Sequence, residues 1–110
     1  MPVYKKLVRD RIPEIIEATG KKYTTRILEE QEYKTELQKK MREELAEYLS
    51  ATSDKDSLEE LADLLEVIHA LTAVHESTPN QLEVIRMEKA EKRGGFQERL
   101  FLIDVEEDEI

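Results

Sequence analysis

Residues 42–63 read REELAEYLSATSDKDSLEELAD and carry the clearest indication of how this chain folds. Glu44 and Glu47 precede a short polar stretch, and Glu60 and Asp63 follow it. Because residues three apart share one face of a helix, each pair presents two carboxylates side by side. Two such helices, packed antiparallel, would bring all four carboxylates together.

This acidic arrangement predicts a cation site. Like charges at a spacing of three or four residues destabilise a helix by roughly a few tenths of a kcal/mol per pair, and a bound cation removes that repulsion. Ligands that are all oxygen, without Cys or His, suit hard ions, so Mg²⁺ is expected, with Mn²⁺ as a substitute. Ions of this kind also bind phosphates, which indicates metal-dependent phosphate chemistry.

Two structural alternatives stand beside the metal site. Of the 110 residues, 26 are acidic, so pairs of acids at this spacing also arise on solvated helix faces. Ser57 and Glu60 in addition fit a capping box, in which Glu60 would only satisfy a free backbone amide. The leucines beside the acids, such as Leu45 and Leu61, place the cluster next to apolar faces and favour the metal site.

Length and composition indicate one small, mostly α-helical domain at residues 1–105, followed by an acidic tail at residues 106–110. Charged residues make up 39% of the chain and aromatic residues 5%. The net charge of −9 disfavours binding to duplex nucleic acid. With no cysteine, no apolar run of membrane-spanning length and no apolar signal core near the N-terminus, a soluble cytoplasmic protein is expected.

The pattern of apolar residues predicts an antiparallel helical bundle that is completed by oligomerisation, because the third helix is apolar around more than half of its circumference. That helix should be the most buried element. Short extended segments are expected near residues 23–28 and 100–105, the second being either a strand or a docked segment. The expected helices lie near residues 11–19, 30–51, 57–74 and 78–93.

Basic residues gather at both ends of this acidic chain. One group lies within residues 3–11, and the other lies beside Gly94 and Gly95. They serve solubility and pairing with the abundant Glu, or they bind phosphate. The candidate phosphate-binding residues are Lys5, Lys6, Arg9, Lys89, Lys92 and Arg93.

The spacing of the four acids, two ExxE/D steps separated by twelve residues, resembles that of the MazG-like all-α nucleoside triphosphate pyrophosphohydrolases. Residues 3–13, VYKKLVRDRIP, and residues 92–96, KRGGF, are similar to the two ends of a small single-domain branch related to MazG and to phosphoribosyl-ATP pyrophosphohydrolase. The likeness therefore extends along most of the chain.

The resemblance implies a homodimer or homotetramer, two or more Mg²⁺ ions per site, and a nucleotide substrate cleaved between its α- and β-phosphates to a monophosphate and pyrophosphate. It also implies that Glu43 is a further ligand or a base. The residues themselves support a mechanism in which Mg²⁺, with Glu43 or Glu47, activates the attacking water. The alternative from another class is a non-catalytic acidic helical module that binds a basic partner. By the resemblance, the metal ligands are Glu44, Glu47, Glu60 and Asp63.

Overall fold

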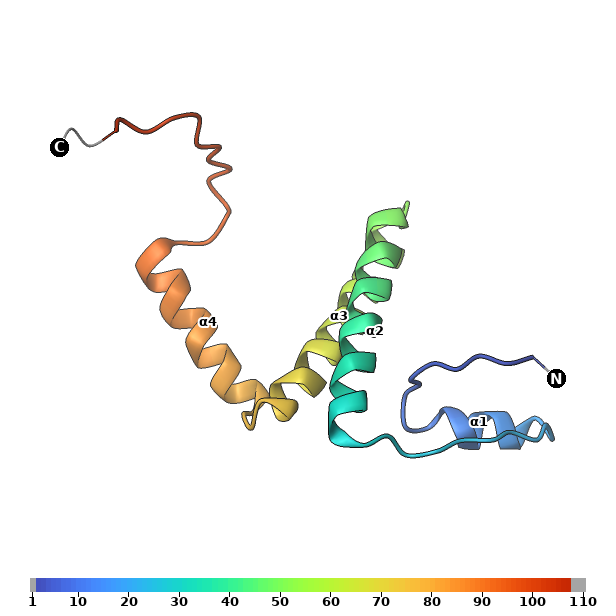
Figure 1. Cartoon of the computed structure of the whole chain (residues 1–110). Coiled ribbons are helices and arrows are strands. Elements are labelled where there is room, and N and C mark those ends of the chain that lie inside the picture. Colours follow the sequence, from blue (N-terminus) through green and yellow to red (C-terminus); the bar gives the residue numbers. More distant parts are fainter. Residues whose placement is uncertain (1, 108–110) are drawn as a thin grey trace. The chain divides into compact units, whose positions relative to one another are not determined.

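The computed structural model describes residues 2–107, and within this range all regular structure is α-helical (Figure 1). The all-α prediction is therefore confirmed. None of the helices formed by these residues combines the length and the apolarity needed to cross a membrane. The helices are α1 (Ile12–Ala18), α2 (Glu30–Ser50), α3 (Asp54–Val74) and α4 (Pro79–Arg93).

The chain divides into two compact units, one ending at Pro79 and the other beginning at Asn80. The first unit contains α1, α2 and α3, and the second contains nearly all of α4 and the irregular segment that follows it. The acidic residues 44–63 all belong to the first.

Helix α2 forms where the sequence repeats apolar residues every fourth position. Its residues are mainly Glu, Lys, Gln, Leu and Arg, whose unbranched side chains lose little freedom in a helix. Leu37 is the buried apolar residue of this helix, with 4% of its surface exposed. The helix ends at Ser50, because Ala51 takes an extended conformation with ψ 139°.

Residues 51–53 connect α2 to α3, and Ser53 is the N-cap of α3. The Ser53 hydroxyl accepts a hydrogen bond of 3.1 Å from the Asp56 backbone N–H, and Asp54 and Asp56 favour the positive end of the helix dipole. The expectation that Ser57 caps this helix is wrong, since Ser57 already lies inside it. Glu60 is therefore not a capping residue, and the structural alternative for its carboxylate does not hold.

Helices α2 and α3 pack against each other, and α3 is partly behind α2 in Figure 1. The core of this pair is small: Leu37 and Val67 are its buried apolar residues, and Thr72 is also buried. The expectation that α3 is the most buried element is confirmed, since α3 has more buried and half-buried residues than any other described helix, yet Leu61 and Leu65 keep 42% and 50% of their surface exposed. One neighbouring helix is too few to cover its apolar circumference.

The C-terminus of α3 closes with the Schellman pattern of hydrogen bonds. The Glu76 N–H donates to Ala73 O and the Ser77 N–H donates to Thr72 O, both at 3.0 Å. Glu76 takes the left-handed conformation of this motif, with φ 59°. Glycine is the usual residue there, so Glu76 carries a steric cost of roughly 1–2 kcal/mol.

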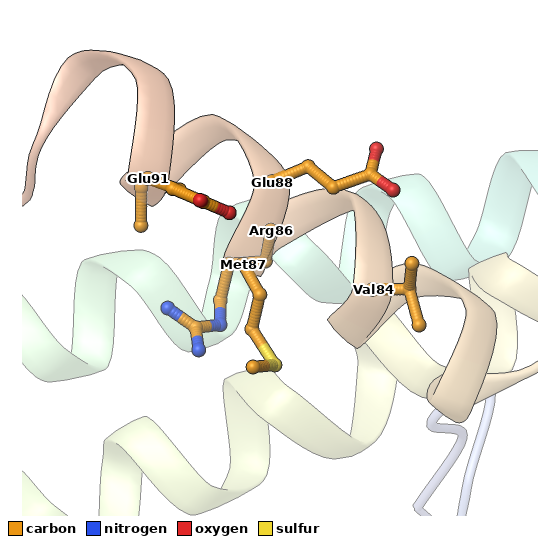
Figure 2. A pocket seen from close by; sticks show the side chains of 6 residues that line it. Val84, Arg86, Met87, Glu88 and Glu91 are labelled. Atoms are coloured by element: carbon orange, nitrogen blue, oxygen red, sulfur yellow. The ribbon is translucent and has the colours of Figure 1, made fainter.

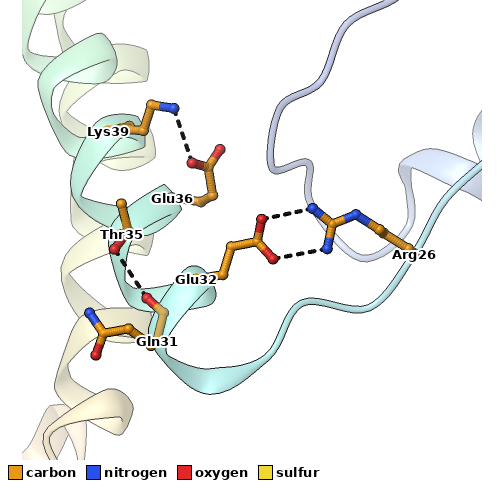
Figure 3. A network of polar contacts seen from close by, with 6 residues as sticks. All are labelled: Arg26, Gln31, Glu32, Thr35, Glu36 and Lys39. Carbon is orange, nitrogen blue, oxygen red and sulfur yellow. Dashed lines mark hydrogen bonds and ion pairs between the residues drawn. The ribbon is translucent and has the colours of Figure 1, made fainter.

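The segment between α1 and α2 is fastened to α2 by an arginine. The guanidinium group of Arg26 donates two hydrogen bonds to the Glu32 carboxylate, of 2.9 and 2.7 Å (Figure 3). This parallel pair of bonds fixes both the distance and the orientation of the two groups. Residues 23–28 themselves form neither helix nor strand.

In the second unit, α4 begins at Pro79 and ends at Arg93, as the sequence predicts. Gly94 follows with φ 80°, the left-handed conformation that favours glycine after a helix. Residues 100–105 have no strand partner among the described residues and form no strand, so that alternative is not found. Residues 106–107 of the acidic tail are also irregular, and residues 108–110 lie outside the described range.

Candidate metal site

Three carboxylates converge where α2 and α3 pack together. Glu44 and Glu47 lie one turn apart on α2, and Glu60 lies in the second turn of α3. One oxygen atom from each lies within 4.8 Å of the oxygens chosen from the other two. The sequence predicts that four acids converge, from the helical period and from antiparallel packing across a short polar connection, and the structure brings three of them together.

Burial distinguishes this cluster from a solvated acidic face. Glu44 keeps only 6% of its surface exposed, whereas isolated carboxylates are rarely buried to this extent. Its Oε2 atom and the Oε2 atom of Glu60 are both buried without a hydrogen-bond partner. A buried charged oxygen without a partner is costly, so these two atoms call for a cation or a proton.

The electrostatics of Glu44 agree with its surroundings. Burial raises the pKa of the Glu44 carboxyl group above its ordinary value, because the charged form loses its water. The carboxyl group of Glu47 raises the pKa further by sharing a hydrogen bond with Glu44 and by repulsion, and Asp63 adds a smaller repulsion. The positive charge of Lys40 lowers the pKa of Glu44, but by less than burial and the neighbouring acids raise it.

Lys40 is a residue of the site that the sequence analysis did not identify. Its Nζ atom lies 3.5 Å from Glu44 Oε1 and 3.7 Å from Glu43 Oε2. The sequence does indicate these contacts, because Lys40 precedes Glu44 by four residues and Glu43 by three and therefore shares their helix face. Lys40 supplies one positive charge beside a cluster of several negative ones.

Asp63, the fourth acid of the sequence pattern, engages an arginine instead of the other three acids. The Arg9 Nη2 atom donates a hydrogen bond of 2.6 Å to Asp63 Oδ1. Asp63 does not belong to the group of oxygens within 4.8 Å of one another that Glu44, Glu47 and Glu60 form. The contact joins residues 54 positions apart, which places the basic N-terminal segment beside the acidic cluster.

The other predicted site residues lie in different surroundings. Glu43, the candidate base, is 45% exposed and is not one of the three converging acids. Lys6 lies over the ring of Tyr4, with Nζ 5.7 Å from the ring centroid, and Lys5 has a φ of 45°. The α4 cations belong to the second unit: Lys89, Lys92 and Arg93.

The donor set fits a hard divalent cation. All the candidate ligands are carboxylate oxygens, which suit Mg²⁺ or Mn²⁺, and the softer Cys ligands do not occur in the chain. The two unpartnered Oε2 atoms are the orphaned groups that such an ion would satisfy. These three carboxylates could therefore hold a metal ion.

A surface depression lies on α4. It is open and is lined by residues of α4 alone, among them Val84, Met87 and Glu91 (Figure 2). A hollow between the side chains of one helix cannot enclose a nucleotide. The carboxylate cluster is therefore the candidate site.

Comparison with known proteins gives a partial likeness and does not assign a family. The chain is 45% identical over 53 residues to an uncharacterized protein of Mycolicibacterium smegmatis. The matched region covers 48% of this chain and 54% of that protein, so the chain spans about half the length of the relative that it matches. No protein-family model matches the chain, and no solved structure matches it.

Proposed function

We propose that this protein is a MazG-like, Mg²⁺-dependent nucleotide pyrophosphohydrolase. The observation that supports the proposal most directly is Glu44, whose Oε2 atom is buried and has no hydrogen-bond partner beside two further carboxylates. A solvated acidic face would leave such an oxygen in water. The spacing of the four acids and the two basic ends of the sequence supply the resemblance that names the reaction.

In this proposal the acids have distinct roles. Glu44, Glu47, Glu60 and Asp63 would hold the metal ions, and Mn²⁺ could replace Mg²⁺. Bound Mg²⁺ would neutralise the charge that develops on the phosphates during in-line displacement. Glu43 or Glu47, the more exposed acids, would accept the proton of the attacking water, because a base must be reachable from solvent and substrate.

The basic residues would complete the charge balance for a triphosphate. Carboxylates repel phosphate, so the substrate needs metal ions together with local cations. Arg9 lies beside the acidic cluster through its contact with Asp63. The remaining candidates for phosphate binding are Lys5, Lys6, Lys89, Lys92 and Arg93.

We also propose that the protein is a homodimer or a homotetramer. The support is that α3 leaves Leu58, Leu61 and Leu65 exposed in a single chain, by 67%, 42% and 50% of their surfaces. These residues are spaced by three and four positions, so they share one helix face. A second copy of the chain would cover that face and enlarge a core that is small for 110 residues.

A panel of ordinary, deoxy and damaged nucleoside triphosphates, scored for pyrophosphate release with and without Mg²⁺, tests the activity. Asp63→Asn and Glu60→Gln should lower turnover by about two orders of magnitude or more while the helical circular dichroism persists. Glu59→Gln, an adjacent exposed change on α3, is the matched control. If no triphosphate yields pyrophosphate and Mg²⁺ leaves the melting temperature unchanged, the acidic interaction module becomes the better assignment.

The position of cleavage is tested by hydrolysis in water labelled with heavy oxygen. The products should be a nucleoside monophosphate that carries the label and unlabelled, intact pyrophosphate, as expected for attack at the α-phosphorus. Label in the pyrophosphate would move the attack to the β-phosphorus. Free phosphate as the first product would overturn the assignment.

A further inference from the structure

The contact between Arg9 and Asp63 joins the basic N-terminal segment, residues 2–11, to the acidic cluster. Arg9 Nη2 lies 2.6 Å from Asp63 Oδ1, a short, charge-assisted hydrogen bond. The pair is partly exposed, with 56% of the Arg9 side chain and 41% of the Asp63 side chain accessible. Its two members can therefore separate without disturbing the core of α2 and α3.

Asp63 should belong to the same cluster as the other acids by its sequence position. It lies three residues after Glu60 on α3 and so shares that helix face. The Asp63 carboxylate is close enough to Glu44 that repulsion between the two raises the pKa of Glu44. Yet its oxygens lie outside the group that Glu44, Glu47 and Glu60 form, and the guanidinium group of Arg9 holds one of them.

We propose that Arg9 and a divalent metal ion compete for Asp63. Loading of the cluster then releases Arg9 together with residues 2–11, and the freed guanidinium group becomes available to the phosphates of the substrate. The inference rests on the proposed function, because it takes the cluster to be a metal site. The buried, unpartnered Oε2 atom of Glu44 is the independent sign of that site, with only 8% of the Glu44 side chain exposed.

If Arg9 instead helped to orient Asp63 as a metal ligand, removing Arg9 would change the metal affinity in the opposite direction. An arginine that orients a metal ligand strengthens metal binding, and its removal lowers metal affinity by about 10- to 100-fold. An arginine that competes for the ligand weakens binding, so its removal raises the affinity. The geometry points to competition, because Arg9 holds one oxygen of Asp63 while Asp63 stays outside the group of oxygens that the three converging acids form.

The test is Mn²⁺ binding, measured by electron paramagnetic resonance on the full chain at about 0.15 M salt, where screening limits the effect of distant charges. Arg9→Gln should tighten Mn²⁺ binding by about two- to fivefold, the factor that corresponds to losing an exposed ion pair. Arg11→Gln removes the same charge from a residue that pairs with Glu14 at 3.9 Å, and it should leave the affinity unchanged. Weaker or equal binding by Arg9→Gln overturns the competition.

Limited tryptic cleavage after Lys5 and Lys6 gives a second readout. Mn²⁺ should speed this cleavage in the wild-type protein and should leave its rate unchanged in Arg9→Gln, where the segment is already free. Asp63→Asn should be cleaved rapidly at the same positions without any metal. Slower cleavage with Mn²⁺ in the wild type contradicts the release. Mn²⁺ binding to neither protein would instead overturn the proposed metal site, and the competition with it.

Discussion

Glu44 is a buried carboxylate whose charge should lower the stability of the folded protein when no cation is bound. Its charge is removed from water, and the nearest cation, Lys40, lies 3.5 Å from one oxygen and leaves the other without a partner. Sites that carry perturbed pKa values of this kind are often functional. The burial of Glu44 therefore predicts how a substitution there changes the stability of the protein, which can be tested without a substrate.

We expect Glu44→Gln to raise the melting temperature at neutral pH in the presence of a chelator, because the amide has the same shape and no charge to bury. A carboxyl group whose pKa is raised on folding favours the native state at low pH, and this contribution is lost as the pH rises through the raised pKa. The difference between variant and wild type should therefore shrink on acidification. Differential scanning fluorimetry across a pH series measures it.

Glu59→Gln is the matched control for this prediction, because the side chain is exposed on the neighbouring helix. It should change the melting temperature little at any pH. A Glu44→Gln variant that is less stable than the wild type throughout would mean that the Glu44 charge is stabilising, and would contradict the account of its burial.

The C-terminal cap of α3 contains a strained backbone conformation that a glycine would relieve. Glu76 holds the left-handed position of the Schellman motif at φ 59°. Glu76→Gly should stabilise the protein by about 0.5–1 kcal/mol, since glycine removes the steric cost but gains entropy in the unfolded chain. Urea denaturation measures the change, with Glu66→Gly, inside α3, as the opposing control that should destabilise by about 1 kcal/mol. Equal destabilisation by both changes would contradict the strain.

The segment before α2 gives a second prediction about a single element. The hydrogen bonds from Arg26 lower the pKa of the Glu32 carboxyl group. A carboxylate with a lowered pKa stabilises above its unfolded pKa, and the contribution disappears as the pH falls through the lowered value. Proteolysis within residues 21–29 should therefore accelerate in Arg26→Gln at neutral pH and become equal to that of the wild type in acid. Lys39→Gln, which breaks the Lys39–Glu36 pair within α2, should have no such effect.

The elements differ in how far the sequence predicts them. The α2 bounds follow from its four-residue apolar repeat, and Gly94 marks the end of α4. The start of α3 is misplaced because Ser53 and Ser57 are each followed three residues later by an acid, so a local capping pattern cannot choose between them. The connection between Arg9 and Asp63 has no local signal, because it depends on how chain segments 54 residues apart come together.

The exposed apolar surface and the net charge have opposite effects on the self-association of this protein. The chain carries a net charge of −9, which disfavours self-association, yet α3 exposes leucines along one face. We expect the apolar face to prevail, because hydrophobic burial yields about 25 cal/mol per Å² and the charge repulsion is screened by salt. Sedimentation at micromolar concentration should show a dimer or tetramer.

The matched variants for this prediction each introduce one negative charge. Leu58→Glu changes an exposed leucine in the first turns of α3, where the helix dipole tolerates an acid, and should shift the protein toward the monomer. Gln38→Glu, on an exposed polar position of α2, should leave the assembly intact. A monomeric wild-type protein would count against the shared bundle.

The three residues between α2 and α3 also have a kinetic consequence. Closing so short a loop costs little entropy, and the contacts across it are near in sequence, which are the conditions for rapid folding. The hairpin of α2 and α3 should therefore form in a first-order step whose rate does not depend on protein concentration. Association of chains would follow as a slower, bimolecular step, and dilution during refolding would separate the two phases.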